Sequence, residues 1–504
     1  MHDHKHPREK DRDLILKVMG TMPSPREARQ FLSKFSPPTP KVPAPSATKK
    51  KGDTDFVDTL LWPTDHLALI KLEGPFEKQS LTAIANTLVQ LQRLGLMSVV
   101  MLDNQTWWQD AGGLDQSAET RQRMMKDMLE LVEEIEKSGG KARPVSEDIF
   151  EAPPHRRPGH DRISQQHETS DEVTIRPGLC PIQSCLKLQQ IPVMIPMATT
   201  TSSHRIPVQS NEALVALAKY MGSTVKKDSV PAGAGQHGPL VPMRLVVVNT
   251  TGGIPLTRTN GMDGPTHCFV NLKDEYSIIL DDLDHMDSIS APLAKSYRSD
   301  LDMIKESLEH LPPTCSALIT SSPSLTLITN LITDKPLFSS TMRGQDPKVM
   351  LATTVLRSGL DIFTFRNSLE GLDLKRLQGL LESSFGKPMD AEGFYARIQD
   401  RTKTVILAGQ DYMGAAIVTR EGGTLRDPSQ GEAGGRLASV AYLDKFSVAP
   451  KSQGIGVADI LWKKLTDEFP DLIWRSRSDN PVNKWYFDRA DGNIKIPGTN
   501  WTPS

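Results

Sequence analysis

The order of apolar and polar positions divides the chain into two parts with different rhythms. In the first part, short apolar runs of strand length alternate with stretches whose apolar residues recur at helical spacing. The spacing predicts a strand over His66–Leu72, a helix over Leu81–Leu94 and a second strand over Ser98–Leu102. Because strands alternating with helices are typical of an α/β layer, we expect a parallel sheet here.

This rhythm continues to about residue 340, so we expect one α/β domain over residues 53–345. Further strands are predicted at Ile191–Ile195, Leu245–Asn249 and Glu275–Leu280, and further helices at Glu119–Ser138, Asn211–Gly222, Pro292–Leu311 and Ser324–Ile332. Between them, the polar stretch Arg143–Val173 carries His155, His160 and His167. Their spacing places no two imidazoles on one face, which favours a solvated insertion over a metal site.

A second unit, residues 353–504, is predicted to contain two helices and an antiparallel meander after its first strand. Its expected elements are strand Leu356–Phe365, helices Asp373–Ser384 and Ala391–Gln399, strands Thr402–Ala408, Met413–Thr419 and Leu437–Val448, helix Gly456–Glu468, strand Leu472–Arg477 and helix Asn483–Arg489. This order is an α+β arrangement. Residues 1–52 form a basic segment that ends in a proline- and lysine-rich linker, Ser36–Gly52.

Charge and cysteine usage narrow the classes of partner. The chain has 59 basic and 61 acidic residues, so no overall field favours nucleic acid or an acidic membrane. No apolar run approaches the roughly 20 residues that span a bilayer. The four cysteines include no CxxC pair, which predicts reduced thiols and no metal site.

A glycine-bearing turn follows the strand that ends at Val448. The segment Lys451–Gly456 reads KSQGIG and opens a helix, so its backbone N–H groups and the helix dipole can bind a pyrophosphate. A plain strand-to-helix turn is the alternative. The formal GxGxxG at Gly233–Gly238 precedes a strand rather than following one, so we interpret it as a loop.

An arginine-bearing strand comes next. Arg475 and Arg477 are two residues apart and therefore share one face, where paired guanidinium groups can recognise carboxylates. A surface salt-bridge ladder is the alternative. Tyr486 follows on a short helix, and its phenol can protonate a leaving thiolate or simply be a half-buried aromatic.

These residues together resemble the GNAT acetyltransferase superfamily. Within it, the segments YLDKF (Tyr442–Phe446), QGIGVADILW (Gln453–Trp462), WRSRSDNPVNKWYF (Trp474–Phe487) and FGK (Phe385–Lys387) resemble N-acetylglutamate synthases of the fungal mitochondrial type. The resemblance covers roughly Thr353–Asp491.

The resemblance implies transfer of acetyl from acetyl-CoA to the α-amino group of L-glutamate, without a metal. It assigns glutamate binding to Lys387, Lys445, Arg475, Arg477 and Asn480, and acetyl-CoA binding to Phe446, Val448, Gln453, Gly454, Ile455, Gly456 and Val457. Tyr486 and Asn480 are the expected catalytic residues, with Tyr486 as general acid. The base stays open between a water relayed by backbone carbonyls and Asp444.

In this family a three-layer αβα amino-acid-kinase-like domain precedes the transferase. The kinase glycine pair corresponds here to Lys71-Leu72-Glu73-Gly74, where a glutamate would repel phosphate. The resemblance therefore implies a regulatory domain inhibited by L-arginine, a homo-oligomer, a possible complex with acetylglutamate kinase, and a mitochondrial matrix location.

The sequence is also compatible with two other functions. One is a catalytically silent regulatory subunit that binds arginine or the kinase, and the other is a GNAT enzyme for a different amine. The retained cluster of lysine, arginine and tyrosine favours the glutamate enzyme over both. We also expect the strand beside the acceptor site, from Trp501 onward, to be missing or altered.

Overall fold

The chain folds into two compact units, each described here by itself. The structure is a computed structural model that describes residues 67–93, 96–108, 116–147, 149–153, 172–176, 179–226, 240–256, 266–321, 353–424, 437–453, 455–480, 482–487, 489–494 and 499–503. The first unit holds most of the chain up to Leu356. The second holds Arg357–Ser504 together with Phe269–Ile278.

A parallel sheet forms the centre of the first unit. Its strands are β1 (Leu67–Glu73), β2 (Met97–Asp103), β3 (Ala142–Val145), β6 (Ile191–Met194), β9 (Pro242–Asn249), β11 (Ser316–Ser321) and β12 (Thr353–Arg357). They lie in the order β12-β11-β9-β1-β2-β6-β3. Leu67 to Leu72 are all buried, as are Met97 to Leu102. Strands covered on both faces become apolar without alternation, which is what the sequence shows.

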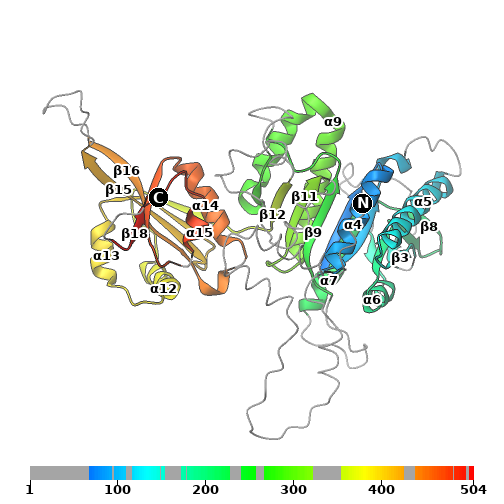
Figure 1. Cartoon of the computed structure of the whole chain (residues 1–504), viewed down its shortest axis with the longest axis horizontal. Helices are drawn as coiled ribbons and strands as arrows, with labels where there is room; N and C mark the ends of the chain where they lie inside the picture. Colours follow the sequence, from blue (N-terminus) through cyan, green and yellow to red (C-terminus); the bar gives the residue numbers. More distant parts are fainter. Residues whose placement is uncertain are drawn as a thin grey trace, which may run out of the picture. The chain divides into compact units, whose positions relative to one another are not determined.

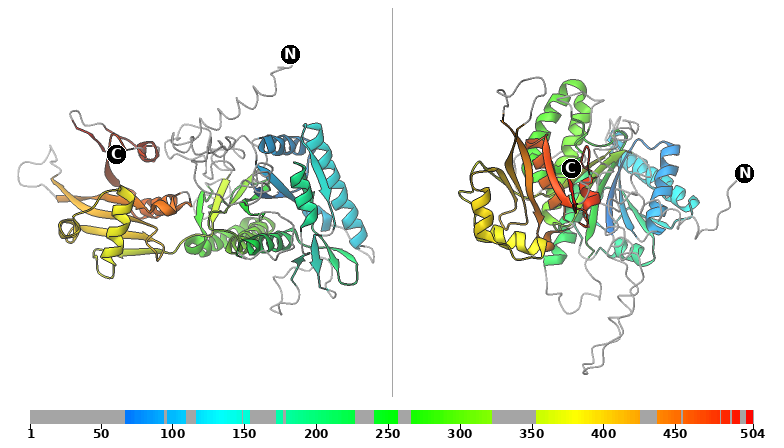
Figure 2. Two further views of the ribbon diagram at one scale, coloured as in Figure 1. Left: turned by 90° about the horizontal axis from the view of Figure 1, so that it is seen from below. Right: turned by 60° about the vertical axis from the view of Figure 1, so that its left-hand side comes forward.

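Helices lie on both faces of this sheet (Figures 1 and 2). They are α4 (Lys78–Arg93), α5 (Gln116–Lys137), α6 (Cys180–Lys187), α7 (Ser210–Lys226) and α9 (Leu272–His310), with a 3-10 turn η1 (Gln105–Trp108) after β2. The predicted three-layer α/β arrangement is confirmed.

The strand predicted at Glu275–Leu280 is wrong, because these residues lie inside α9. Ile279, Leu283 and Met286 are all fully buried, and their spacing of four and three is helical rather than alternating. Asp274 and Glu275 in the first turn favour a helix start at this place.

A smaller sheet accompanies the main one. It has the order β5-β4-β7-β8, built from β4 (Phe150–Ala152), β5 (Thr174–Ile175), β7 (Met197–Thr200) and β8 (Arg205–Pro207). The stretch predicted as a solvated insertion, Arg143–Val173, therefore begins with structured residues of β3 and β4. Its three histidines lie outside the described residues.

The second unit is a mostly antiparallel sheet in the order β13-β14-β15-β16-β17-β18. Its strands are β13 (Ile362–Arg366), β14 (Thr402–Ala408), β15 (Gly414–Thr424), β16 (Leu437–Val448), β17 (Leu472–Arg477) and β18 (Trp501–Pro503). Its helices are α12 (Leu374–Phe385), α13 (Ala391–Ile398), α14 (Val457–Glu468) and α15 (Asn483–Phe487), with a 3-10 turn η4 (Pro450–Ser452). The short β10 (Phe269–Asn271) precedes α9 and belongs to this unit by contact.

Successive side chains of β14 and β15 point to opposite faces of the sheet, and helices cover both faces. Ile406 and Val418 pack against α14, whereas Val405 and Ile417 pack against α12 and α13. Successive side chains of a strand point to opposite faces, so one helix layer lies on each side. The predicted α+β unit is confirmed.

The single strand predicted over Leu356–Phe365 is in fact two. β12 ends at Arg357 and β13 begins at Ile362. Gly359 between them has a φ of +89°, which breaks an extended chain.

The strand expected to be missing or altered from Trp501 onward is present as the short β18. Arg475, Ser476 and Arg477 of β17 pair antiparallel with Pro503, Thr502 and Trp501 of β18. The prediction that this strand is missing is wrong, because the backbone of the three residues Trp501–Pro503 is enough to pair with β17.

Several sequence features lie outside the described residues, namely the segment 1–52, the loop Gly233–Gly238, the helix predicted at Ser324–Ile332, and Gly454. Among the described cysteines, Cys185, Cys268 and Cys315 are thiols that form no disulfide. Over the described part of the chain, no helix is long and apolar enough to cross a membrane.

Candidate active site

The sheet of the second unit splits where β16 and β17 part. The two strands pair in parallel only from Ala441 to Leu443 on β16 and from Leu472 to Trp474 on β17. Beyond this point β17 pairs with β18, and no described strand pairs with the β17-facing edge of β16 from Asp444 to Val448. An unpaired strand edge presents backbone N–H and C=O groups to an extended ligand that carries amides.

A turn at the end of β16 opens α14. Gly456 is the residue before the helix and adopts φ 86° and ψ 4°. It has no side chain to cap α14, so the N–H groups of the first turn lie open at the helix end. Such an end binds phosphate through its N–H groups and its positive dipole.

Gly456 is required for a second reason. A Cβ atom at this position would lie 2.7 Å from Nε and 2.8 Å from Cδ of Arg357. Arg357 is only 4% exposed, so its side chain has little room to withdraw. The backbone of the turn and a buried guanidinium thus lie in direct contact.

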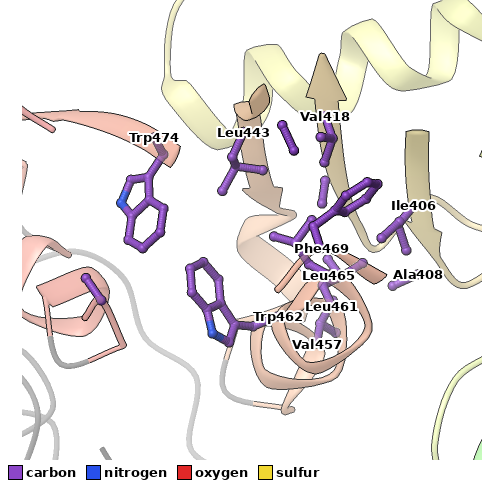
Figure 3. Packing of buried hydrophobic residues seen from close by; sticks show 13 residues of the cluster. Ile406, Ala408, Val418, Leu443, Val457, Leu461, Trp462, Leu465, Phe469 and Trp474 are labelled. Carbon is purple, nitrogen blue, oxygen red and sulfur yellow. The ribbon is translucent and has the colours of Figure 1, made fainter. Parts of the chain in front are cut away.

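Aromatic rings cover the α14 side of the split. Phe446 of β16 lies 5.9 Å from Trp462 and 5.6 Å from Trp485, centroid to centroid. Trp462 of α14 also meets Trp474 of β17 edge to face at 5.3 Å (Figure 3). The rings join β16, β17, α14 and α15 into one apolar wall.

Tyr486 lies in this wall. Its ring centroid is 5.3 Å from Trp485, 6.1 Å from Trp474 and 6.3 Å from Phe446. Among the described residues its hydroxyl has no hydrogen-bond partner. Burial raises the pKa of Tyr486 to about 12, so the phenol is protonated at neutral pH and can donate a proton.

Two buried polar atoms beside the split also have no partner in the described part of the chain. They are Ser447 Oγ on β16 and Trp474 Nε1 on β17. Ser447 is 3% exposed and Trp474 is 6% exposed. Because buried polar groups are normally hydrogen-bonded, these atoms and the open edge of β16 fit a polar ligand such as the acyl-pantetheine arm of acetyl-CoA.

The opposite side of the split carries the predicted cations. Lys445 Nζ lies 2.6 Å from Asp444 Oδ1 and 5.0 Å from the ring centroid of Phe394 on α13. Arg397 of α13 donates two hydrogen bonds to the same carboxylate, at 2.8 and 3.0 Å. Asp444 is held by two cations at once, so the cluster keeps a net positive charge.

Arg475 and Arg477 point away from the aromatic wall. Trp474 and Ser476 are buried and the two arginines are exposed, as alternation along β17 requires. Arg475 Nε donates to the Tyr442 hydroxyl at 3.1 Å. Arg477 forms a bidentate pair with Asp479 at 2.9 and 3.0 Å. The prediction that both arginines share one face is confirmed.

Lys387 and Asn480 have different surroundings. Lys387 is exposed just after α12 and has no ion-pair partner among the described residues. The end of α12 is held at the end of β16, because Ser384 Oγ donates to the Val448 carbonyl at 3.0 Å. Asn480 braces its own turn, donating to Ser476 Oγ at 3.0 Å and accepting from the Val482 N–H at 3.2 Å.

Comparison with known proteins gives this arrangement a family. A sequence model described as the N-acetyltransferase domain of N-acetylglutamate synthase matches residues 364–502. A mitochondrial amino-acid acetyltransferase of Coprinopsis cinerea is 33% identical over 96% of this chain and 84% of its own length. One of Laccaria bicolor is 34% identical over 97% and 90%. The chain belongs to the mitochondrial amino-acid acetyltransferase family.

A solved structure shows the same fold across both units. N-acetylglutamate synthase from Neisseria gonorrhoeae, complexed with coenzyme A and N-acetyl-glutamate, is 13% identical with a TM-score of 0.50. The match covers 87% of this chain and 94% of that one. In the present chain, the first unit is therefore the amino-acid-kinase-like domain and the second unit is the GNAT domain. The mitochondrial names of the relatives agree with the compartment expected from the sequence.

The kinase-like unit of this acetyltransferase contains a buried charge cluster at the end of β1. Lys71 Nζ lies 2.6 Å from Glu73, 2.6 Å from Asp300 on α9 and 3.0 Å from Asp103. Burial opposes the charge of Lys71, but the three carboxylates raise its pKa well above the ordinary value. Burial, together with the negative charge of Asp300, raises the pKa of Glu73 to about 8.

This cluster supports the interpretation of Lys71–Gly74 made from the sequence. The lysine that would face ATP phosphates is already neutralised by carboxylates of the protein itself, and added phosphate would meet repulsion. Over the described residues, no group of side chains could hold a metal ion.

Sequence reasoning missed several residues that shape the site. Arg397 and Arg357 each lie in a different element from the motif they support, whereas Trp474 lies in the same strand as Arg475 and Arg477. No spacing rule brings α13 beside β16, or the end of β12 beside Gly456. Only Trp474 carried a signal, because it opens the WRSR segment.

Proposed function

We propose that the chain transfers the acetyl group of acetyl-CoA to the α-amino group of L-glutamate. The observation that carries this proposal is the split between β16 and β17. One side offers an open strand edge, a helix end for a pyrophosphate and the half-buried phenol of Tyr486. The other side offers cations suited to a ligand with two carboxylates.

Acetyl-CoA supplies the reactive thioester, and the residues of the chain position it. The edge of β16 around Phe446 and Val448 holds the pantetheine arm. The turn from Gln453 through Gly454 and Ile455 to Gly456 and Val457 holds the pyrophosphate. The apolar wall excludes water from the thioester, which strengthens each polar contact inside the split.

Glutamate binds on the face that carries the cations. Lys445, Arg475, Arg477 and Lys387 supply positive charge for its two carboxylates. Asn480, which braces the turn after β17, completes the set. Asp479 shields Arg477, so this arginine must exchange its carboxylate partner when glutamate arrives.

The reaction then needs one proton donor. The ammonium group of glutamate first gives one proton to the relayed water. The free amine then attacks the carbonyl carbon, the C–S bond breaks, and Tyr486 gives its phenolic proton to the leaving sulfur. The nitrogen loses its second proton to water, which restores the phenol in the next step. Asp444 already accepts bonds from Arg397 and Lys445, which favours a water relay over Asp444 as the base.

Regulation and assembly form the second part of the proposal, and the family resemblance supports them. The first unit regulates this first step of L-arginine biosynthesis, with L-arginine as feedback inhibitor. A transit peptide in residues 1–52 directs import, and the enzyme works as a homo-oligomer that can associate with acetylglutamate kinase.

The test is glutamate-dependent release of CoA, followed with a thiol reagent in the presence of acetyl-CoA. We expect release with L-glutamate, little with L-glutamine, which lacks the second carboxylate, and less when L-arginine is added. A folded protein that releases no CoA with glutamate contradicts the proposal. Equal rates with glutamate and glutamine contradict the assigned role of the cations.

A further inference from the structure

An ion pair joins α14, the helix at the proposed pyrophosphate turn, to the segment that carries Tyr486. Arg489 Nη2 lies 2.9 Å from Asp459 Oδ1, and Asp459 lies in the first turn of α14. The exposed fractions of the two side chains are 16% and 22%. The pair is therefore better shielded from solvent than an ordinary surface pair.

Arg489 also holds the helix that carries Tyr486. Its guanidinium carbon lies 4.1 Å above the ring of Trp485, and its Nη1 donates to the Trp485 carbonyl at 3.3 Å. The Arg489 N–H donates to the Tyr486 carbonyl at 3.0 Å. One side chain thus contacts the residue next to Tyr486 in two ways while its charged end is fixed on α14.

Tyr486 depends on such support. Its hydroxyl has no hydrogen bond within the described part of the chain, and ring contacts alone surround it. The helix α15 spans only the five residues Asn483–Phe487, too short to be stable by itself. A displacement of about 1 Å can cost roughly a hundredfold in rate, so the placement of this short helix matters for proton donation.

We infer that Arg489 is a positioning residue: by bridging Asp459 and Trp485, it holds the Tyr486 hydroxyl at the split where the thiol leaves. Arg489 touches neither substrate in this scheme and acts only through Tyr486. The inference rests on the proposed function of Tyr486 as general acid.

The test is a mutant cycle between Arg489→Met and Tyr486→Phe in the full-length chain. Methionine keeps an unbranched apolar stem but removes the guanidinium. We expect Arg489→Met to lower kcat roughly 10- to 100-fold. The KM for glutamate, and the affinity for acetyl-CoA measured by calorimetry, should stay within about twofold of the wild type. In the Tyr486→Phe background, the same change should have no further effect on kcat.

Two further variants make the cycle specific. Arg489→Lys keeps the charge but loses the planar stack on Trp485, so it should recover part of kcat. Arg366→Met removes the 3.0 Å ion pair between Arg366 and Glu468 at the other end of α14, and it should leave kcat unchanged. If Arg489→Met does not fold, Asp459→Asn replaces it, with a smaller fall in kcat that also vanishes in the Tyr486→Phe background.

The outcomes separate this inference from the proposed function. Equal fold losses from Arg489→Met in both backgrounds overturn the positioning role while Tyr486 remains the acid. A weaker affinity for acetyl-CoA with unchanged kcat also overturns it, since Arg489 would then serve the turn instead. An unchanged kcat in Tyr486→Phe alone removes the acid itself.

Discussion

Both units place a lysine near the end of a strand, yet the two lysines have opposite surroundings. In the first unit Lys71 is 2% exposed and has three carboxylates within 3.0 Å. In the second unit Lys445 shares one carboxylate with Arg397, and Lys387 has no acidic partner among the described residues. The charge of Lys71 is balanced by carboxylates of the protein and stabilises the fold. The positive charge of Lys445 and Lys387 is not fully balanced and is available to bind an anionic ligand.

The same contrast holds for the polar atoms. Beside the split, the Ser447 hydroxyl and the Trp474 indole N–H are buried and have no hydrogen-bond partner among the described residues. Lys71 instead donates to Glu73 and Asp300. An enzyme needs unsatisfied groups directed at the place where the substrate will lie, and in the second unit such groups lie beside an open strand edge.

The largest effect should come from Tyr486→Phe, which removes the proton donor and leaves the ring in place. We expect kcat to fall about 10²- to 10⁴-fold, with the KM for glutamate little changed. Because the pKa of Tyr486 is about 12, the wild type should show no alkaline loss of activity from this group below about pH 11. Steady-state kinetics against pH checks both points, and an unchanged kcat refutes the acid role.

Lys71→Met tests whether the lysine of the first unit has a structural role. Removing the one cation leaves Glu73, Asp103 and Asp300 without their shared counter-ion, and breaking such a shielded ion pair typically costs about 3–5 kcal/mol. Hydrogen exchange of the β1 and β2 amides should report this loss, while kcat per folded molecule stays the same. The control Lys137→Met removes an exposed lysine from its ion pairs with Glu133 and Glu134 on α5, and it should leave the exchange unchanged. Unaltered protection in Lys71→Met contradicts the structural role.

Gly456→Ala tests the turn before α14. Alanine in a left-handed conformation costs about 1–2 kcal/mol, and its Cβ would collide with Arg357. Because about 1.4 kcal/mol corresponds to a factor of ten in affinity, we expect the KM for acetyl-CoA to rise about tenfold or more. The matched control is Gly379→Ala inside α12, where a Cβ meets nothing within 4 Å. Similar KM values in the two variants would show that the turn does not hold the cofactor.

Arg397→Gln should have a smaller effect, on glutamate alone. With Arg397 gone, Asp444 neutralises Lys445 completely, so the KM for glutamate should rise about two- to fivefold, equivalent to about 0.5–1 kcal/mol. The control is Arg376→Gln on α12, which breaks the exposed ion pair between Arg376 and Asp411. This variant should leave the KM for glutamate unchanged. If the KM for acetyl-CoA rises instead, Arg397 contributes to the binding of acetyl-CoA and the assignment to glutamate is wrong.

The last prediction concerns the stability of the first unit, rather than catalysis, as a function of pH. The pKa of Glu73 is raised from 4.5 to about 8, so the folded state keeps a proton that the unfolded chain has released. Its contribution to stability is complete below about pH 4.5 and is lost as pH rises through 8. Glu73→Gln should therefore lose less stability than the wild type between pH 5 and 8.5 in urea unfolding. Parallel curves for the two proteins exclude this linkage.

The sequence predicted the fold well where periodicity was clear. The buried strands around Ile70 and Val100 and the helices of the second unit lie where the apolar spacing placed them. It failed at Glu275–Leu280, because a short β-branched run can be helical when its neighbours complete a 3.6-residue repeat. It also failed at Trp501, because strand pairing depends on the backbone of a distant partner.

The motif residues of the candidate site could be predicted, but not their connections. Arg475, Lys445 and Tyr486 stand in recognisable segments. The contacts Arg397–Asp444, Arg357–Gly456 and Arg489–Asp459 join residues between 30 and 99 positions apart, read from the numbering. Such contacts follow from the packing of helices on the sheet and leave no local pattern.

One measurement tests the central contrast between the two units directly. The full-length chain is incubated with acetyl-CoA, MgATP and L-glutamate, and the mixture is followed by proton and phosphorus NMR. We predict growth of an N-acetyl resonance of acetylated glutamate together with free CoA, while the ATP resonances stay constant. Consumption of ATP without an N-acetylated product would contradict the account, because it would place the chemistry at the Lys71 cluster instead of at the split beside Tyr486.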